Sequence, residues 1–320
     1  MKALFTDYQY EDIHQELKIL TATGAEIVDL QQDKSITLAE AVRTADAIIV
    51  QYAEMTAELI ATMERCKMII KYGIGVNNID VAAAAAKGIY VCNVPDYGID
   101  EVSNTAISMM MSLHRKLPAT QNALRKGTWG YDVMIPIKRL SGSVLGLVGL
   151  GRIPSLVAKK MAGFGVELIA CDPYVNPTHA AELGVKLVDF EMLCKESDII
   201  SIHCALTDET HHMFNADVFK AMKSNAIIIN TARGPVICEA DLIEALNAGE
   251  IAGAGLDTFE VEPIVADNPL LTMENVICTP HVAWYSEQAI ENVQRGAAED
   301  AARVLRGEVP KNPVNRPTIG

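Results

Sequence analysis

Three segments in the last third of the chain contain side chains that could carry out chemistry. Arg233 lies in NTARGPVI, Glu262 in LDTFEVEP and His281 in TPHVAW. The planar guanidinium of Arg233 suits a carboxylate, which it can bind through two parallel hydrogen bonds. His281 can give or take a proton near neutral pH, and Glu262 could hydrogen-bond and orient its imidazole. The three residues together predict a carboxylate site beside a proton donor.

Each of these groups has a structural alternative when it is taken alone. An arginine after a strand is commonly a surface cation, and a lone histidine commonly serves structure. Glu262-Pro263 could simply open a loop. A nucleotide-binding signal elsewhere in the chain would therefore favour the functional interpretation.

The elements expected to position these groups are parallel strands. Short β-branched and apolar runs alternate with helical patterns, which predicts two doubly wound α/β units. Ligands of such sheets bind at the carboxyl ends of the strands. The first unit is expected to have strands at 2–7, 25–30, 47–52, 68–73 and 90–94. After a long helix at 101–126, the second has strands at 144–150, 166–172, 185–189, 198–204, 226–232, 252–259 and 276–281.

The segment VGLGRIPS has the context of a dinucleotide-binding loop, because it lies between a predicted strand and a predicted helix. Gly149 would make the tight turn, and Gly151 would let the backbone approach a pyrophosphate. The amides of Arg152 and Ile153 would hold the phosphates. Pro154 replaces the third glycine but falls in the first helical turn, where a missing N–H is tolerated. We expect binding to persist, with a small shift of the helix and weaker affinity.

An acidic residue, Asp172, ends the next predicted strand. A carboxylate at this point accepts hydrogen bonds from the adenosine ribose and repels a 2′-phosphate. The sequence therefore predicts NAD in preference to NADP. The alternative is that Asp172-Pro173 forms an ordinary turn at the end of the strand.

The composition limits the possible partners and the location of the protein. The 27 Lys and Arg residues and 41 Asp and Glu residues give a net charge of −14, which disfavours nucleic acid and anionic membrane surfaces. The N-terminus lacks the features of a signal peptide and no apolar run approaches a membrane span, so a cytoplasmic location is expected. The seven scattered cysteines indicate reduced core thiols, and no metal site is expected.

The sequence resembles the D-isomer-specific 2-hydroxyacid dehydrogenases over essentially its whole length. The motifs that carry the resemblance are KYGIGVNNID at 71–80, NVP at 93–95, VGLGRIP at 148–154, NTARG at 230–234, Leu256-Asp257, Glu262-Pro263 and TPH at 279–281. The resemblance implies an NAD-dependent oxidoreductase that interconverts a 2-keto acid and the D-2-hydroxy acid by hydride transfer. It also implies a flavodoxin-like substrate domain (1–100 and 287–320), an inserted Rossmann-type cofactor domain (101–286), a cleft between them, and a homodimer formed through the cofactor domain.

The same resemblance implies a role for each site residue. Arg233 would bind the substrate carboxylate and polarise the carbonyl, His281 would donate the proton, and Glu262 would support His281. The amides of Ile74 and Gly75 would hold the other side of the carboxylate, as suits a glycine-flanked turn. Around the cofactor it places Asp257 at the nicotinamide carboxamide, Thr231 and Ala232 nearby, and Cys204 and Thr210 at the adenine side.

The sequence also departs from the family pattern, with Lys71 where many members have arginine, Asn77 where aspartate is usual, Asn104 where an acid is usual, and Ala205 in place of a common proline. None of these departures removes the expected proton donor, His281, or the arginine expected to bind the carboxylate, Arg233. Lys71 offers a point charge in place of a planar fork, which would alter the orientation of the substrate.

The substrate is expected to be a 2-keto acid with a medium-sized or partly apolar side chain, because Tyr52 and Trp284 would line its pocket. Trp284 could instead belong to the core. A D-3-phosphoglycerate or hydroxypyruvate-type dehydrogenase is an alternative, but the loop at 51–56 has no cation to hold a phosphate. Since the sequence ends at Gly320, no separate regulatory domain is expected.

The segment HVAWYSEQA at 281–289 indicates a second possible class of function. It is closest to the C-terminal-binding protein branch, whose eukaryotic members are NAD-sensing transcriptional corepressors. A protein of that kind would bind NADH tightly, turn over slowly and offer a hydrophobic groove to short peptides. We favour the enzyme.

Overall fold

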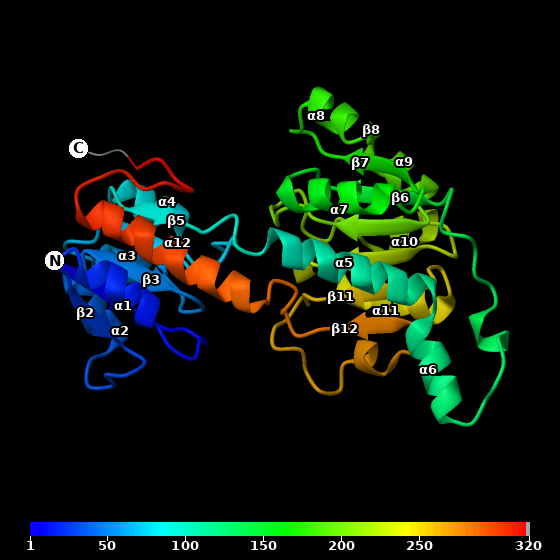
Figure 1. Cartoon of the computed structure of the whole chain (residues 1–320), viewed down its shortest axis with the longest axis horizontal. Helices are drawn as coiled ribbons and strands as arrows, with labels where there is room; N and C mark the ends of the chain where they lie inside the picture. The colour runs from blue at the N-terminus through cyan, green and yellow to red at the C-terminus, as the bar shows by residue number, and fades with distance from the viewer. Residues whose placement is uncertain (318–320) are drawn as a thin grey trace. The chain divides into compact units, whose positions relative to one another are not determined.

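The computed structural model describes residues 1–317, which fold into two compact units (Figure 1). The first unit comprises Met1–Gly98 and the chain after Tyr285, and the second comprises Ile99–Tyr285. Residues 318–320, the end of the predicted substrate domain, lie outside the described residues. Across residues 1–317, no helix has both the length and the apolar character needed to cross a membrane.

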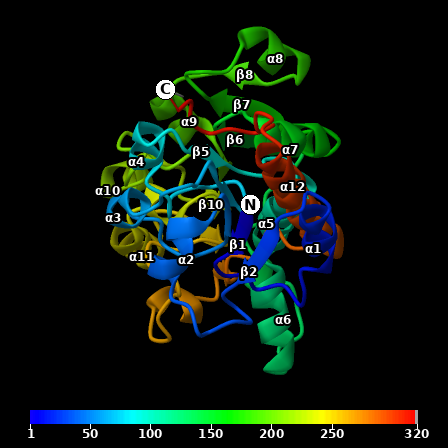
Figure 2. The ribbon, with the colours of Figure 1, turned by 90° about the vertical axis from the view of Figure 1, so that its left-hand side faces the viewer.

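The first unit is built on a parallel sheet of order β2-β1-β3-β4-β5, which is the flavodoxin-like order. Its strands are β1 (Lys2–Phe5), β2 (Glu26–Asp29), β3 (Ala47–Val50), β4 (Met68–Lys71) and β5 (Tyr90–Cys92). Alternate strand residues point to opposite faces and build two cores. One core is covered by α1 (His14–Thr21) and α12 (Glu287–Leu305), and the other by α2 (Leu38–Thr44), α3 (Ala57–Ala61) and α4 (Val81–Ala86) (Figure 2).

The second unit has a parallel sheet of order β12-β11-β10-β9-β6-β7-β8. Its first three strands run outward as β6-β7-β8, and the chain then returns to pair β9 beside β6, as in a Rossmann fold. The strands are β6 (Val144–Val148), β7 (Glu167–Cys171), β8 (Lys186–Leu187), β9 (Ile199–Ile202), β10 (Ile227–Asn230), β11 (Gly253–Leu256) and β12 (Val276–Cys278). The predicted fold class is therefore confirmed.

Helices cover both faces of this second sheet. One face carries α5 (Ile99–His114), α7 (Arg152–Ala162) and α8 (Pro177–Glu182), with α5 and α7 side by side in Figure 1. The other carries α9 (Phe190–Glu196), α10 (Ala216–Ala221) and α11 (Glu239–Ala248). Short 3₁₀ turns are η1 (Asp132–Met134), η2 (Gly234–Val236) and η3 (Pro269–Thr272).

The expectation of one helix over 101–126 is wrong. The chain forms α5 and a separate helix α6 (Leu117–Arg125), with Lys116 between them in a left-handed conformation, φ 50°. Pro118 lies in the first turn of α6, where its ring starts a helix but could not continue one.

Candidate active site

The glycine loop leaves β6 at Gly149, whose φ of 90° favours glycine. A side chain there would lie 3.3 Å from the backbone of His203 and Cys204, so the loop passes close to the end of β9. Gly151 is the N-cap of α7, and a Cβ placed on it meets nothing within 4 Å. This open space over the backbone is what a pyrophosphate needs for close approach.

The start of α7 supplies amide groups to the same space. Arg152 and Ile153 are its first two residues, where N–H groups have no partner within the helix. Pro154 is buried as the third residue, and the first helical hydrogen bond runs from the Ser155 amide to the Gly151 carbonyl at 3.0 Å. The proline therefore removes no helical hydrogen bond and does not interrupt the helix.

Asp172 lies beside the glycine loop at the end of β7. Its Oδ2 accepts a hydrogen bond from the Leu150 amide at 2.7 Å, and its Oδ1 accepts from the amides of Tyr174 and Val175 at 2.8 and 3.1 Å. These bonds fix the carboxylate and leave lone pairs that ribose hydroxyls could use. The turn interpretation and the ribose interpretation are thus compatible.

The predicted adenine-side residues lie in the chain after β9. Cys204 is half-buried, and burial raises the pKa of its thiol to about 11, so it offers a neutral surface. The Thr210 hydroxyl donates to the Ala205 carbonyl at 2.7 Å and accepts from the Thr207 amide at 2.8 Å. Thr210 thereby shapes this loop through its own hydrogen bonds.

The turn after β10 contains an unsatisfied polar group. The buried Thr231 Oγ1 has no hydrogen-bond partner within residues 1–317, and a bound cofactor could supply one. Asn230, which belongs to the NTARG motif but had no predicted role, is fully buried and organises the turn. Its Oδ1 accepts from the Ala232 amide at 3.0 Å, and its Nδ2 donates to the Arg233 carbonyl at 2.8 Å.

Gly234 brings Arg233 next to the loop that follows β11. A Cβ on Gly234 would lie 1.8 Å from the Phe259 carbonyl oxygen, so only glycine allows this approach. The guanidinium of Arg233 donates through Nη1 to the Ala232 carbonyl at 2.6 Å. The close contact therefore joins the arginine turn to the segment that carries Glu262.

We expect Gly234→Ala to destabilise the protein by more than about 3 kcal/mol, because the methyl group must displace backbone atoms. Chemical unfolding followed by circular dichroism measures the change. Gly163→Ala is the matched control, since Gly163 has helical geometry and its added Cβ would lie 3.8 Å from the Lys160 carbonyl. Equal stability of the two variants would contradict the close approach of Gly234 to the Phe259 carbonyl.

Glu262 and His281 form a hydrogen-bonded pair of titratable groups. His281 Nδ1 lies 2.7 Å from Glu262 Oε2, and Glu262 Oε1 accepts from the Phe259 amide at 3.0 Å. Burial alone would raise the pKa of Glu262. The hydrogen bonds from His281 and Phe259 and the charges of His281 and Arg233 outweigh burial and lower this pKa below its ordinary value.

His281 is held in a left-handed conformation, with φ 56°. Its amide donates to the Asp257 carbonyl at 2.8 Å, and its own carbonyl accepts from Trp284 Nε1 at 3.0 Å. The Asp257 carboxylate accepts from Thr279 Oγ1 at 2.6 Å and from the amides of Val282 and Ala283, both at 2.9 Å. Asp257 and Trp284 therefore both fix the turn that carries His281, a function that their sequence positions did not reveal.

The predicted substrate residues of the first unit lie at the carboxyl ends of neighbouring strands. Lys71 ends β4, and its Nζ lies 5.3 Å from the ring centroid of Tyr52, which follows β3. Beyond Lys71, the amides of Ile74 and Gly75 donate no hydrogen bond within the described chain. Two free amides in one turn suit a carboxylate oxygen.

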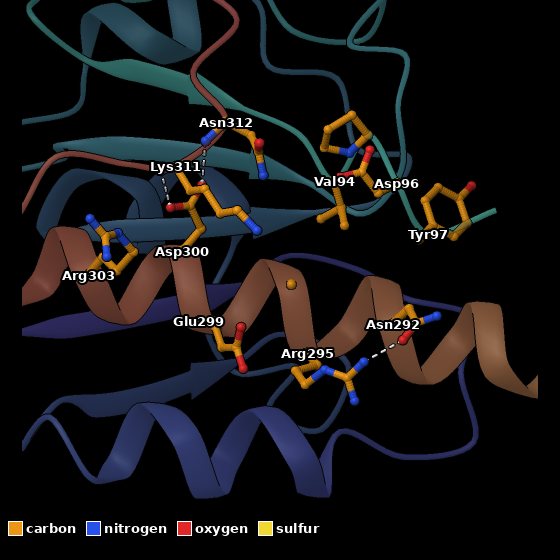
Figure 3. Close-up of a pocket in the computed structure, with 12 residues that line it drawn as sticks. Val94, Asp96, Tyr97, Asn292, Arg295, Glu299, Asp300, Arg303, Lys311 and Asn312 are labelled. Carbon is orange, nitrogen blue, oxygen red and sulfur yellow. Dashed lines mark hydrogen bonds between the residues drawn. The ribbon is translucent and has the colours of Figure 1, made fainter. Parts of the chain in front are cut away.

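A pocket of about 450 Å³ lies elsewhere in the first unit, between the segment after β5, α12 and the chain beyond it (Figure 3). It contains none of the predicted site residues, and two of its charged residues have partners within the unit. Arg303 pairs with Glu308 at 3.2 Å, and the buried Asp300 accepts hydrogen bonds from the amides of Lys311 and Asn312.

The glycine loop, the helix that follows it and the acidic end of the next strand define a dinucleotide-binding domain of the Rossmann class. Residues 107–283 match the model of the D-isomer specific 2-hydroxyacid dehydrogenase family, NAD binding domain. The chain therefore belongs to the D-isomer specific 2-hydroxyacid dehydrogenases. This match confirms the predicted family and the predicted NAD cofactor.

The chain is similar to several members of the family. It is 40% identical over 321 residues to D-3-phosphoglycerate dehydrogenase of Methanocaldococcus jannaschii, with 100% of this chain but only 60% of the relative covered. It is 36% identical to glyoxylate reductase of Korarchaeum cryptofilum, with 88% and 86% covered. A solved D-lactate dehydrogenase from Aquifex aeolicus, complexed with NAD and lactic acid, superposes with a TM-score of 0.89 at 29% identity, over 99% of this chain and 100% of that one.

Proposed function

We propose that the protein is an NAD-dependent D-2-hydroxyacid dehydrogenase that reduces a 2-keto acid to the D-2-hydroxy acid. The observation that carries the proposal is the 2.7 Å contact between His281 and Glu262 in the unit that has the dinucleotide loop. When bound, the nicotinamide supplies the hydride. Gly149, Gly151, the amides of Arg152 and Ile153, Asp172 and Thr231 would hold the cofactor, with Ala232, Cys204, Thr210 and Asp257 around it.

Substrate binding and proton transfer are proposed for different groups of this chain. Arg233 binds the substrate carboxylate and polarises the keto group, and the amides of Ile74 and Gly75 are the carboxylate-binding groups that the first unit offers. Glu262 occupies Nδ1 of His281, so Nε2 is the atom that donates the proton to the keto oxygen. The carboxylate of Glu262 stabilises the charged imidazolium before that transfer.

The substrate side chain is proposed to be medium-sized or partly apolar, in contact with Tyr52 and Trp284. The loop at 51–56 offers no cation, and the amides of Gln51, Tyr52 and Ala53 already donate to the Asp7 carboxylate. Initial rates of NADH oxidation test this with pyruvate, glyoxylate, hydroxypyruvate, 4-methylthio-2-oxobutyrate and phenylpyruvate. A larger kcat/KM for 3-phosphohydroxypyruvate than for any of these would overturn the proposed substrate class.

The protein is proposed to be a cytoplasmic homodimer that binds no nucleic acid, in keeping with its charge of −14. The α6 helix has no buried residues, and large apolar side chains on and after it are exposed. Several large exposed apolar side chains in one segment favour an interface between copies of the chain. Its exposed members are Leu117, Leu124, Trp129, Tyr131 and Ile135.

Trp129→Asp is expected to convert the dimer to a monomer, because it would bury a charge in the proposed interface. Trp129 is 90% exposed in the single chain. Sedimentation velocity gives the oligomeric state. Tyr174→Asp is the control, since Tyr174 is 95% exposed and follows β7, outside this segment. This variant should remain dimeric. A dimeric Trp129→Asp variant would exclude the segment as the interface.

A further inference from the structure

The first unit contains a carboxyl group that the proposed chemistry does not use. Glu16 lies on α1 with none of its surface exposed. Its Oε1 accepts a hydrogen bond from the Tyr72 hydroxyl at 2.5 Å, whereas its Oε2 has no hydrogen-bond partner within residues 1–317. Burying a carboxyl group that is not fully satisfied costs free energy, so its hydrogen bond from Tyr72 is the feature to explain.

The surroundings of Glu16 favour hydrogen bonding over ion pairing. Burial raises the pKa of Glu16, and polar contacts with Tyr72, with its own backbone and with Gln294 oppose that rise. The acidic groups coupled to it are Asp12 and the phenols of Tyr8, Tyr10 and Tyr72. None of these groups is a cation that could form an ion pair with Glu16. Glu16 therefore interacts with Tyr72 through a hydrogen bond.

Tyr72 joins this buried group to the predicted carboxylate-binding loop. It directly follows β4, and its amide donates to the Val50 carbonyl at 2.8 Å. Its ring packs edge-on against Tyr10, with centroids 5.2 Å apart. The next residue, Gly73, turns the chain with φ 138° toward Ile74 and Gly75.

The far side of the loop is held by different contacts. The Gly73 carbonyl accepts from the Val94 amide at 2.9 Å, and the Ile74 carbonyl accepts from Asn93 Nδ2 at 2.7 Å. These two bonds fix the carbonyls and leave the amides of Ile74 and Gly75 available. The side chain of Tyr72 is therefore the anchor at the strand end of the loop.

We propose that Glu16 is a positioning residue that acts through the Tyr72 hydroxyl to hold the Gly73–Gly75 loop ready for the substrate carboxylate. The inference rests on the proposed function, because that function gives the loop amides their ligand. It predicts that loss of this one hydrogen bond weakens binding of the keto acid and leaves binding of NADH unchanged.

The test compares Tyr72→Phe, Glu16→Leu and Glu16→Gln with the control Tyr8→Phe. Tyr8 is also buried, and its hydroxyl also donates to a carboxylate, Asp29 Oδ2 at 2.8 Å. Tyr72→Phe and Glu16→Leu should raise KM for the keto acid about 3- to 10-fold, as loss of one hydrogen bond allows. KM for NADH should stay within twofold. Glu16→Gln retains an acceptor oxygen and should approach the wild type, and Tyr8→Phe should change neither KM.

Thermal unfolding of each variant shows whether it is folded, and Tyr72→Phe still tests the proposal if Glu16→Leu fails to fold. The proposal is wrong if Tyr72→Phe raises KM for the keto acid no more than Tyr8→Phe does, or if it raises both KM values equally. A wild-type protein that reduces no keto acid would instead refute the proposed function. Binding of oxamate to the NADH complex, followed by calorimetry, separates these two failures.

Discussion

Replacing His281 with alanine is expected to lower kcat for keto acid reduction by about 10²- to 10⁴-fold, the range that a general acid contributes. The proton for the keto oxygen would then have to come from water. The dissociation constant of NADH should stay within about threefold, because the groups predicted to bind the cofactor remain. Initial rates and a fluorescence titration with NADH measure the two quantities.

Glu262→Gln tests the same arrangement through its pH dependence. The lowered pKa of Glu262 keeps its carboxylate charged across the neutral range, where it stabilises the imidazolium of His281. The wild type should lose this stabilisation only as the pH falls through the lowered pKa of Glu262, whereas Glu262→Gln should lack it at every pH, with a smaller loss of kcat than in His281→Ala. An unchanged pH profile in Glu262→Gln would mean that Glu262 and His281 do not carry out the proton transfer. A kcat within tenfold of wild type in His281→Ala would mean the same.

Replacing Arg233 with lysine is expected to lower kcat/KM for the keto acid by about 10²- to 10⁴-fold. Two charge-assisted hydrogen bonds of about 1.5–3 kcal/mol each are lost or distorted, because an ammonium group lacks the planar fork. Retention of the positive charge should not restore activity. Steady-state kinetics over a wide range of keto acid concentrations measures the loss.

Arg303→Lys is the matched control for this substitution. Arg303 also has a carboxylate partner, Glu308, but it lines the pocket of the first unit apart from the predicted site. The control should keep kcat/KM within twofold of wild type. Activity of Arg233→Lys close to that of Arg303→Lys would mean that the fork of Arg233 does not bind the substrate carboxylate.

The fold could be predicted from sequence because its strands are apolar and its turns contain glycine. All twelve expected strands form, but each stops before the end of its predicted range. The residues just beyond the strands bend away into loops, and they include Tyr52, Asp172, Thr231 and Asp257. Apolar and β-branched residues continue beyond the last hydrogen bond between neighbouring strands. The sequence pattern therefore overestimates the length of each strand at its carboxyl end, where the predicted site residues lie.

The supporting contacts of the candidate site could not be predicted, even where they join residues only three positions apart. Asn230 and Trp284 support the catalytic turns through backbone carbonyls, which leave no pattern in the sequence. Other contacts span long stretches of chain: His212 is half-buried, and its Nε2 lies 2.6 Å from Glu260 Oε1, 48 positions later in the sequence. Motif spacing predicted the candidate groups, whereas only the tertiary structure shows what fixes them.

The most direct test of the central claim follows the hydride itself. The protein is mixed with NADH deuterated at C4 of the nicotinamide and with 4-methylthio-2-oxobutyrate, and the product is examined by chiral chromatography and mass spectrometry. We predict a D-2-hydroxy acid that carries deuterium at C2. Tight NADH binding without product would contradict the enzyme and favour an NADH-sensing interaction protein, and an L-configured product would contradict the proposed reaction.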